Sequence, residues 1–296
     1  MTETSPPAHV TITLTRYREP DWLVMETLES LTRQTGVKGE VIFLDQNWRE
    51  GFARDVACLS TPHLIFICEP CPEKGLSHAR NRGLEAANND LVLFIDADAV
   101  AASDWAREMA AALSQGAAVA GARILPRWRG RKPLMARARV VLDQYSLLDW
   151  GEDVIDAPRV VGAGFGLRKS AAPDLMYFDE AFGRREGKLF GGEESDLCAR
   201  LRASGLRIVY CGRAVVHHQI LPERLNWFWI MKRLYFAGAG RRQQGGAPAP
   251  SRKPGFWDWA LLPVILPPYA AGYLLSAGAR RNAATTQNEC IATRTP

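Results

Sequence analysis

Short strand-like runs alternate with stretches of helical periodicity in the first hundred residues, and this alternation restricts the fold more than any other feature. The run at residues 10–14 is β-branched and alternating, the runs at 41–44 and 91–95 are apolar throughout, a further run covers residues 63–68, and helical patterns cover residues 21–35 and 77–87. Strands that are apolar throughout are buried on both faces, and parallel strands need crossovers, which the helical stretches supply. We therefore predict an α/β fold with a mostly parallel central sheet flanked by helices.

The same alternation continues further along the chain. We predict helices over residues 103–114 and 193–204 and strands over residues 118–123, 160–167 and 207–211. The strand with the sequence VVGAGFGL is punctuated by glycine, which indicates that its backbone lies close to another group. Ligands of such sheets bind beyond the carboxyl ends of the strands. The polar residues at these ends are Asp45, Asp96 and Asp98.

Two carboxylates, Asp96 and Asp98, follow the fourth apolar run within the sequence FIDADA. One or two carboxylates can hold Mn²⁺ or Mg²⁺ and leave coordination positions open for substrate phosphates. Such a metal would neutralise a diphosphate leaving group. Two alternatives stay open: the aspartates cap the next helix, or Asp96 is the nucleophile of a haloacid-dehalogenase-like phosphatase.

A second acidic group, GGEESDL, places Glu193, Glu194 and Asp196 at the start of a predicted helix. The helix dipole favours acids there in any protein. The preceding glycine pair, however, allows a ligand to approach, and a carboxylate there can act as general base on an acceptor hydroxyl. Upstream, the sequence KGLSHARN forms a turn at Gly75 that leads into a helix. Arg80 in that helix offers a fork that suits a phosphate or a nearby aspartate.

Two adjacent histidines, His217 and His218, follow the apolar residues 214–216. A strand directs neighbouring side chains to opposite faces, so one of the two can reach the metal or the diphosphate. We take His218 as the candidate ligand, with a packing role as the alternative.

Together, the order of these motifs resembles the family-2 glycosyltransferases, an inverting group with the GT-A fold. The resemblance runs from about residue 10 to about residue 242 and includes Ala79-Arg80-Asn81, the DxD pair, Phe178-Asp179-Glu180 and the acidic helix motif. It implies a GT-A-type nucleotide-binding fold, a nucleotide-diphosphate sugar donor (UDP-sugar favoured), and a saccharide or lipid-linked acceptor of cell-surface polysaccharide or glycolipid synthesis. A catalytically silent nucleotide-sugar-binding protein is the alternative with the same fold.

The resemblance also implies roles for individual residues. Glu194 lies where the family usually has the aspartate of its Glu-Asp pair and is the first choice for general base, with Glu193 and Asp196 as alternatives. The first strand, LTRYREP, lacks the usual proline and asparagine. The candidate nucleotide-binding residues are Thr15, Arg16, Asp45, Gly75, Arg80 and Asp96, and the candidate metal ligands are Asp96, Asp98 and His218.

The chain is expected to comprise a GT-A domain (residues 1–237), a flexible basic linker (238–254) and an apolar C-terminal segment (255–296). Residues 259–279 carry no charge, but three prolines, Pro263, Pro267 and Pro268, should break a regular helix. We therefore expect an interfacial, re-entrant or buried segment instead of a transmembrane helix, which makes a membrane-tending tail.

The charge of the chain and its N-terminal sequence indicate the expected partners and location. A net charge of +5 and a pI near 9.0 indicate anionic partners, which we take to be nucleotides and lipid headgroups, with no nucleic acid. The N-terminus has no signal-peptide pattern. The expected location is the cytoplasm, with any peripheral membrane contact at the inner face of the cell membrane. The CxxC pair of Cys68 and Cys71 lacks the further ligands of a zinc site.

Overall fold

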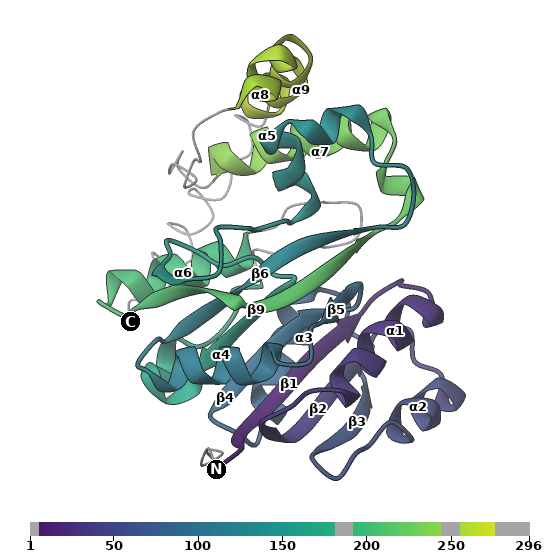
Figure 1. Ribbon diagram of the computed structural model, residues 1–296, viewed down its shortest axis with the longest axis vertical. Coiled ribbons are helices and arrows are strands. Elements are labelled where there is room, and N and C mark those ends of the chain that lie inside the picture. Colours follow the sequence, from purple (N-terminus) through teal and green to yellow (C-terminus); the bar gives the residue numbers. More distant parts are fainter. Residues whose placement is uncertain (1–5, 181–191, 244–254, 276–296) are drawn as a thin grey trace, which may run out of the picture. The chain divides into compact units, whose positions relative to one another are not determined.

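The computed structural model of the protein describes residues 6–180, 192–243 and 255–275, and it contains two compact units (Figure 1). Unit 1 comprises Met1–Arg129 and Ser146–Leu221, and unit 2 comprises Gly130–Tyr145 and Pro222–Pro296. Unit 2 thus includes a segment from the middle of the chain, which the sequence did not predict. The domain limits at residues 237 and 254 stay a prediction.

Unit 1 is built on one mixed sheet. Its strands are β1 (Ala8–Arg16), β2 (Val37–Asp45), β3 (Leu64–Pro70), β4 (Leu91–Asp96), β5 (Ala99–Ala101), β6 (Val119–Trp128), β7 (Val154–Asp156), β8 (Gly164–Arg168) and β9 (Ile208–Ile220). Their order is β3-β2-β1-β4-β8-β6-β9-β5, with β7 paired to β9. Strands β1 to β4 pair in parallel, as do β6 and β9, whereas β8 is antiparallel to both β4 and β6. The predicted α/β fold with a central sheet is confirmed, and the reversed β8 makes the sheet mixed.

Helices cover both faces of this sheet because its strands are apolar on both faces. The helices of unit 1 are α1 (Asp21–Thr32), α2 (Glu50–Ala57), α3 (Leu76–Ala86), α4 (Trp105–Ser114) and α6 (Glu193–Ala203). Ile12 and Leu14 of β1 belong to the core cluster that contains α1, α2 and α4. Val92 and Phe94 of β4 belong to the cluster that contains α3 and α6. Successive side chains of a strand point to opposite faces of the sheet, so each face packs against its own helices, and the result is the three layers of an α/β fold.

Some local details differ from the sequence predictions. Helix α3 begins at Leu76 after Gly75, whereas the predicted helix began at residue 77. Gly75 has φ of 142°, a conformation that suits glycine, and this places the helix start one residue earlier. The sequence also did not predict α2, a short helix that buries only Phe52 and Val56.

Unit 2 is helical in the part that the structure describes. It contains α5 (Arg139–Leu142), α7 (Trp227–Gln243), α8 (Phe256–Ala260) and α9 (Leu262–Leu275). Two glycines allow α7 and α9 to pack closely: a Cβ on Gly238 would lie 2.9 Å from the carbonyl carbon of Tyr269, and one on Gly272 would lie 2.7 Å from that of Tyr235. Among the described residues, no helix has both the length and the apolar character needed to cross a bilayer.

Two expectations for this region need correction. Pro267 and Pro268 lie inside α9, so the prolines do not break the helix. Pro263 lies in its first turn, where a missing N–H costs nothing, and close packing on α7 supports the remainder. Residues 238–243 are helical, although the sequence placed them in a linker. Residues 244–254 lie outside the described residues.

Candidate active site

Arg80 is the centre of the candidate site, because its guanidinium joins the two acidic motifs. Its Nη1 donates to Oε1 of Glu193 at 3.0 Å and to Oε1 of Glu194 at 2.7 Å. Its Nη2 donates to Oδ1 of Asp96 at 3.3 Å. The group therefore holds the end of β4 beside the start of α6. The sequence predicted that Arg80 suits a nearby aspartate, and this contact is confirmed.

Two aromatic rings border this ion-pair group. The guanidinium carbon of Arg80 lies 5.3 Å from the ring centre of Phe165 and 5.7 Å from that of Phe178. Burial alone would lower the pKa of Arg80, but the charges of Glu194, Glu193 and Asp96 raise it. Ion pairs in such low-dielectric surroundings are stronger than ion pairs in water.

The three carboxylates of α6 have different surroundings. The side chain of Glu193 is 2% exposed, and its Oε2 accepts a hydrogen bond from the Gly192 N–H at 2.9 Å. Burial and the charge of Glu194 raise the pKa of Glu193, against the effect of Arg80. Asp196 instead contacts Arg200, one turn along the helix, at 2.9 Å. The structure thus brings Glu193 and Glu194, but not Asp196, to the guanidinium.

Gly162 is part of this site, although the sequence did not single it out. A Cβ at this position would lie 2.7 Å from Nη2 of Arg80 and 3.1 Å from Cδ of Glu194, with a Glu194 carboxylate oxygen closer still. Only a residue without a side chain fits here without moving the ion pair. The glycine run VVGAGFGL was the available signal, and the predicted close approach of its backbone is confirmed.

Asp98 and His218 form a second contact near the end of β4. Nε2 of His218 lies 3.2 Å from Oδ1 of Asp98, and both side chains are buried. Pairing of β5 with β9 places them together, and the Gln219 N–H donates to the Asp98 carbonyl at 2.8 Å. Carboxylate oxygens with one imidazole nitrogen suit a divalent cation such as Mn²⁺. Asp98 and His218 therefore offer the donor types of the predicted metal, but the ligand atoms of Asp96, Asp98 and His218 do not all lie within 4.8 Å of one another.

The neighbouring histidine has a different environment. His217 pairs with Val100 in the β5–β9 register, one position from the His218 pair. Burial, together with the positive charge of Arg127, lowers the pKa of His217. The imidazole of His217 therefore favours its neutral form.

Arg16 and Asp45 lie opposite each other at the carboxyl ends of β1 and β2. Nε of Arg16 donates to Oδ1 of Asp45 at 2.8 Å, and Nη2 forms an ion pair with the other carboxylate oxygen. Nη1 of Arg16 also contacts Asp21 at 2.7 Å. Both predicted nucleotide-binding residues are therefore at the expected edge of the sheet, where they bind each other.

The remaining predicted nucleotide-binding residues lie at the same edge. Thr15 pairs in register with Leu44 on one side and with Asp96 on the other. The carbonyl of Gly75 accepts a hydrogen bond from the Gln46 amide at 3.2 Å, which links the start of α3 to the end of β2. Their contacts with a nucleotide stay a prediction.

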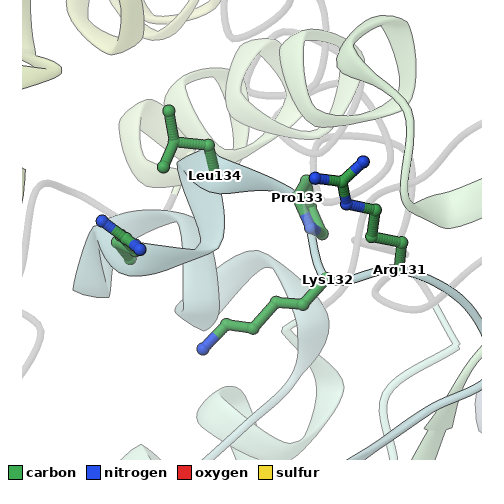
Figure 2. Close-up of a pocket in the computed structure, with 5 residues that line it drawn as sticks. Arg131, Lys132, Pro133 and Leu134 are labelled. Carbon is green, nitrogen blue, oxygen red and sulfur yellow. The ribbon is translucent and has the colours of Figure 1, made fainter.

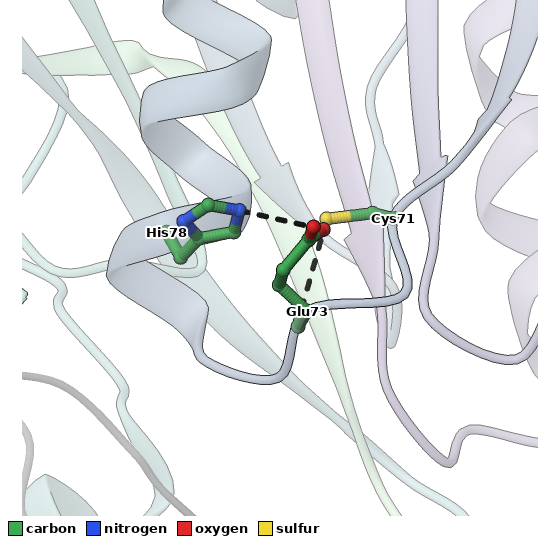
Figure 3. A group of neighbouring side chains, drawn as sticks. All are labelled: Cys71, Glu73 and His78. Carbon is green, nitrogen blue, oxygen red and sulfur yellow. Dashed lines mark hydrogen bonds and ion pairs between the residues drawn. The ribbon is translucent and has the colours of Figure 1, made fainter.

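Cys71, Glu73 and His78 form a compact group before and within α3, shown in Figure 3. They offer ligand atoms that all lie within 4.8 Å of one another. Nδ1 of His78 contacts Glu180 at 3.0 Å. Burial raises the pKa of Cys71, which favours the thiol over the thiolate that metal ligation requires.

Comparison with known families agrees with this geometry. The family model described as Glycosyl transferase family 2 matches residues 12–175, more than half of the chain. The chain belongs to glycosyl transferase family 2. The matched part of this family-2 glycosyltransferase includes Arg80, Asp96 and Asp98 and ends before Glu193.

Two relatives are similar in sequence to most of this family-2 chain. The glucosyl-dolichyl phosphate glucuronosyltransferase of Haloferax volcanii is 25% identical over 224 residues, which cover 73% of this chain and 71% of the relative. The pre-mycofactocin glycosyltransferase of Mycobacterium tuberculosis is 29% identical over 194 residues, which cover 62% of this chain. This family-2 chain spans only 36% of the length of the mycobacterial protein.

Solved structures share the fold of this family-2 glycosyltransferase. GalNAc-T7, crystallised with UDP, GalNAc and Mn²⁺, has a TM-score of 0.59 at 13% identity, over 81% of this chain and 52% of that one. The mannosyltransferase PcManGT of Pyrobaculum calidifontis, in complex with GDP-Man and Mn²⁺, has a TM-score of 0.58 at 17% identity, over 99% of this chain and 83% of that one. At such identities the likeness shows the fold alone.

These comparisons confirm the predicted family and the GT-A fold. The phosphatase alternative is wrong, because the chain is a family-2 glycosyltransferase. Its expected nucleophile, Asp96, also contacts Arg80 at the end of β4, the fourth strand along the chain.

Proposed function

We propose that this family-2 glycosyltransferase moves a sugar from a nucleotide-diphosphate sugar, with a UDP-sugar favoured, to an acceptor hydroxyl with inversion. The observation that carries the proposal is the Arg80 bridge between Asp96 and Glu194, at 3.3 Å and 2.7 Å. It holds a carboxylate suited to the donor side of the reaction beside a carboxylate suited to the acceptor side. Arg80 is a positioning residue in this scheme.

Glu194 is the best candidate for the general base. Its side chain is 14% exposed, so an acceptor hydroxyl can reach it, whereas the side chain of Glu193 is 2% exposed. Burial and the charge of Glu194 raise the pKa of Glu193, and Asp196 lies on Arg200, apart from the Arg80 group. Two neighbouring carboxyl groups with such different surroundings can have different roles in one reaction.

In the proposed reaction, Glu194 accepts the proton of the acceptor hydroxyl as its oxygen attacks the anomeric carbon. The bond between that carbon and the diphosphate oxygen breaks, and the nucleoside diphosphate leaves with the bonding electron pair. Attack on the side opposite to the leaving group inverts the anomeric centre. Arg80 keeps the base in position throughout the step.

Asp96, Asp98 and His218 would hold the Mn²⁺ or Mg²⁺ of the proposed enzyme. A bound divalent cation supplies positive charge that stabilises a departing diphosphate. The short separation of Asp98 and His218, 3.2 Å, supports a shared ligand role. The Mn²⁺ in the structures of GalNAc-T7 and PcManGT supports the choice of metal.

The relatives support the choice of substrates. GalNAc-T7 and TarS of S. aureus were solved with UDP, and PcManGT with GDP-Man, so a nucleotide donor is favoured. The Haloferax relative is named for a glucosyl-dolichyl phosphate substrate. We therefore propose a lipid-linked saccharide as the acceptor, with peripheral contact at the inner face of the cell membrane.

A thermal-shift panel of nucleotide sugars, with and without Mn²⁺, tests the donor and the metal together. Binding at a ligand concentration about 100-fold above Kd stabilises the folded state by about 2.7 kcal/mol. We expect one UDP-sugar to raise the melting temperature only when Mn²⁺ is present, and Asp98→Ala to remove this shift while staying folded. A full shift in Asp98→Ala would contradict the metal assignment.

Release of nucleoside diphosphate from the sugar nucleotide that binds tests the base. We expect Glu194→Gln to bind the donor normally and to lose at least about 100-fold in rate. Asp196→Asn is the matched control and should retain activity, since Asp196 contacts Arg200 and is not part of the Arg80 group. Donor binding without any slow hydrolysis in the unmodified protein would instead support the silent binding protein.

A further inference from the structure

Charge is distributed very unevenly between the two units. Unit 2 carries 14 Lys and Arg against 4 Asp and Glu, a net charge of +10, which leaves unit 1 with 23 basic and 28 acidic residues, a net charge of −5. Such asymmetry within one chain is typical of proteins that bind a polyanionic surface. The positive net charge of the chain therefore comes from unit 2.

Unit 2 also exposes large apolar side chains. Among the described residues, 16 large apolar side chains are exposed, and 10 of them belong to unit 2. Phe256 and Trp259 of α8 are 76% and 64% exposed. The others in unit 2 are Leu134, Trp227, Phe228, Leu262, Leu266, Tyr273, Leu274 and Leu275. Tryptophan and other amphipathic side chains are enriched where proteins meet the interface of a bilayer.

A cationic pocket lies within unit 2 and combines both properties. Arg131, Lys132 and Arg137, with Pro133 and Leu134, line a hollow of about 600 Å³. Figure 2 shows Arg131, Lys132 and Leu134 on neighbouring positions of one segment, with the side chains of Lys132 and Leu134 pointing in different directions. The exposed Leu134 beside three cations matches an amphiphile, whose phosphate needs positive charge and whose chain needs an apolar contact.

Contacts within unit 2 tie the pocket to its aromatic helix. Arg137 lies over the ring of Trp257 in α8 at 4.9 Å, and Asp258 accepts a hydrogen bond from the Val140 N–H at 3.1 Å. The segment that carries the cations is therefore fixed to α8, which carries Phe256 and Trp259. The cationic segment and α8 can therefore contact the same surface together.

We propose that unit 2 docks on the surface of a membrane that contains anionic phospholipids, with a headgroup phosphate in the pocket of Arg131, Lys132 and Arg137. The charge of unit 2 favours a polyanion, and its exposed Phe, Trp and Leu side chains favour a lipid surface over a nucleic acid. The close α7–α9 packing at Gly238 and Gly272 resembles the small-residue packing of helices in lipid. This inference rests on the membrane contact of the proposed function and names its surface and lipid class; vesicle binding tests it separately from sugar transfer.

Cosedimentation of the full chain with vesicles tests the charge contribution. The vesicles contain phosphatidylcholine alone or with about a third phosphatidylglycerol, since anionic lipid attracts basic residues by ~1 kcal/mol each, or ~5-fold in binding. We expect Arg131→Glu, Lys132→Glu and Arg137→Glu together to lower binding to the anionic vesicles by at least ~100-fold. Phosphate ions alone should not compete at millimolar concentration, because the apolar contacts are absent.

The matched control changes the same number of charges in unit 1. Arg33→Glu, Lys38→Glu and Arg54→Glu together replace three exposed basic side chains there. Because the proposed docking surface belongs to unit 2, binding should change by less than ~3-fold, with the remaining charge effect screened by physiological salt. An equal loss in both variants, or equal binding to neutral and anionic vesicles, would overturn the proposal.

A second pair of variants tests the apolar contribution without altering charge. Phe256→Ser with Trp259→Ser should weaken vesicle binding by about 10-fold per side chain, since each loses burial in the lipid interface. Ile65→Ser is the control in unit 1, where Ile65 is 61% exposed, and should bind normally. A dimer in sedimentation equilibrium that the α8 variant dissociates, or duplex DNA binding in place of vesicle binding, would show the proposal to be wrong.

Discussion

Replacement of Gly162 by alanine should change the geometry of the candidate site with little effect on the stability of the fold. Gly162 does not have a positive φ, so its backbone accepts alanine without strain. The new Cβ would lie 2.7 Å from Nη2 of Arg80, whereas an ordinary contact begins at 3.4 Å, so this nitrogen must move by about 0.7 Å. The Glu194 carboxylate oxygen is closer and must move further. Both groups are ends of flexible side chains, so the unfolding free energy should fall by only about 1 kcal/mol.

The effect on catalysis should be much larger than the effect on stability. A displacement of about 1 Å at a catalytic group can cost about 100-fold in rate, or ~2.7 kcal/mol of transition-state stabilisation. We expect kcat/KM for nucleoside diphosphate release to fall by this amount while the melting temperature stays nearly unchanged. Gly51→Ala is the control: its Cβ contacts nothing within 4 Å, and alanine in α2 should stabilise the protein by up to about 1 kcal/mol. Unchanged kcat/KM in Gly162→Ala would refute the assignment of this site, and so would unfolding of the variant.

Two further predictions concern stability. Burial alone would raise the pKa of Glu40, but hydrogen bonds from Thr11 at 2.6 Å and from the Asn88 N–H and amide at 2.8 Å outweigh it and lower that pKa. The ionised Glu40 therefore stabilises the folded protein above its ordinary pKa near 4.5, and this contribution is lost as the pH falls through the lower pKa of the folded protein. In urea unfolding, the unfolding free energy of the unmodified protein should fall over this pH range, and that of Glu40→Gln should lack this part of the fall. Gly272→Ala should destabilise unit 2 by about 1–3 kcal/mol, because its Cβ would overlap backbone atoms of Tyr235. Gly240→Ala, with nothing within 4 Å of its Cβ, should not, and hydrogen exchange of α7 and α9 compares the two; equal protection in both would contradict the packing argument.

The pattern of apolar residues in the sequence was sufficient to predict the strands whose positions depend on their own residues. The β-branched and apolar runs predicted β1 to β4, and the reason is clearest for residues 91–95 of β4, which are apolar throughout because both faces are covered. The DxD pair could be placed at the end of β4 for the same reason. The sequence could not give the direction of β8, since a glycine-rich apolar run is compatible with either orientation and the pairing with β4 and β6 is a tertiary contact.

The site was predictable as a set of motifs, and less so as a set of contacts. The sequence indicated Arg80 as a partner of an aspartate, but not that two glutamates more than one hundred residues away would share its Nη1. It assigned Arg16 and Asp45 to the nucleotide without indicating that they bind each other. Unit 2 combines residues 130–145 with the C-terminal part of the chain, and no local periodicity reports such a long-range association.

The choice of an arginine at position 80 explains how the two acidic motifs can act together. A guanidinium is planar and presents donors in a rigid fork, so one nitrogen can hold Asp96 while the other holds Glu193 and Glu194. A lysine offers a single charged nitrogen on a flexible arm and could not fix two positions at once. In the proposed reaction, the distance between the donor side and the general base is therefore set by the covalent geometry of one side chain, which rotation of a loop cannot change. Burial and the neighbouring charge of Glu194 raise the pKa of Glu193 against the effect of Arg80, as expected where two carboxylates share one guanidinium nitrogen in buried surroundings.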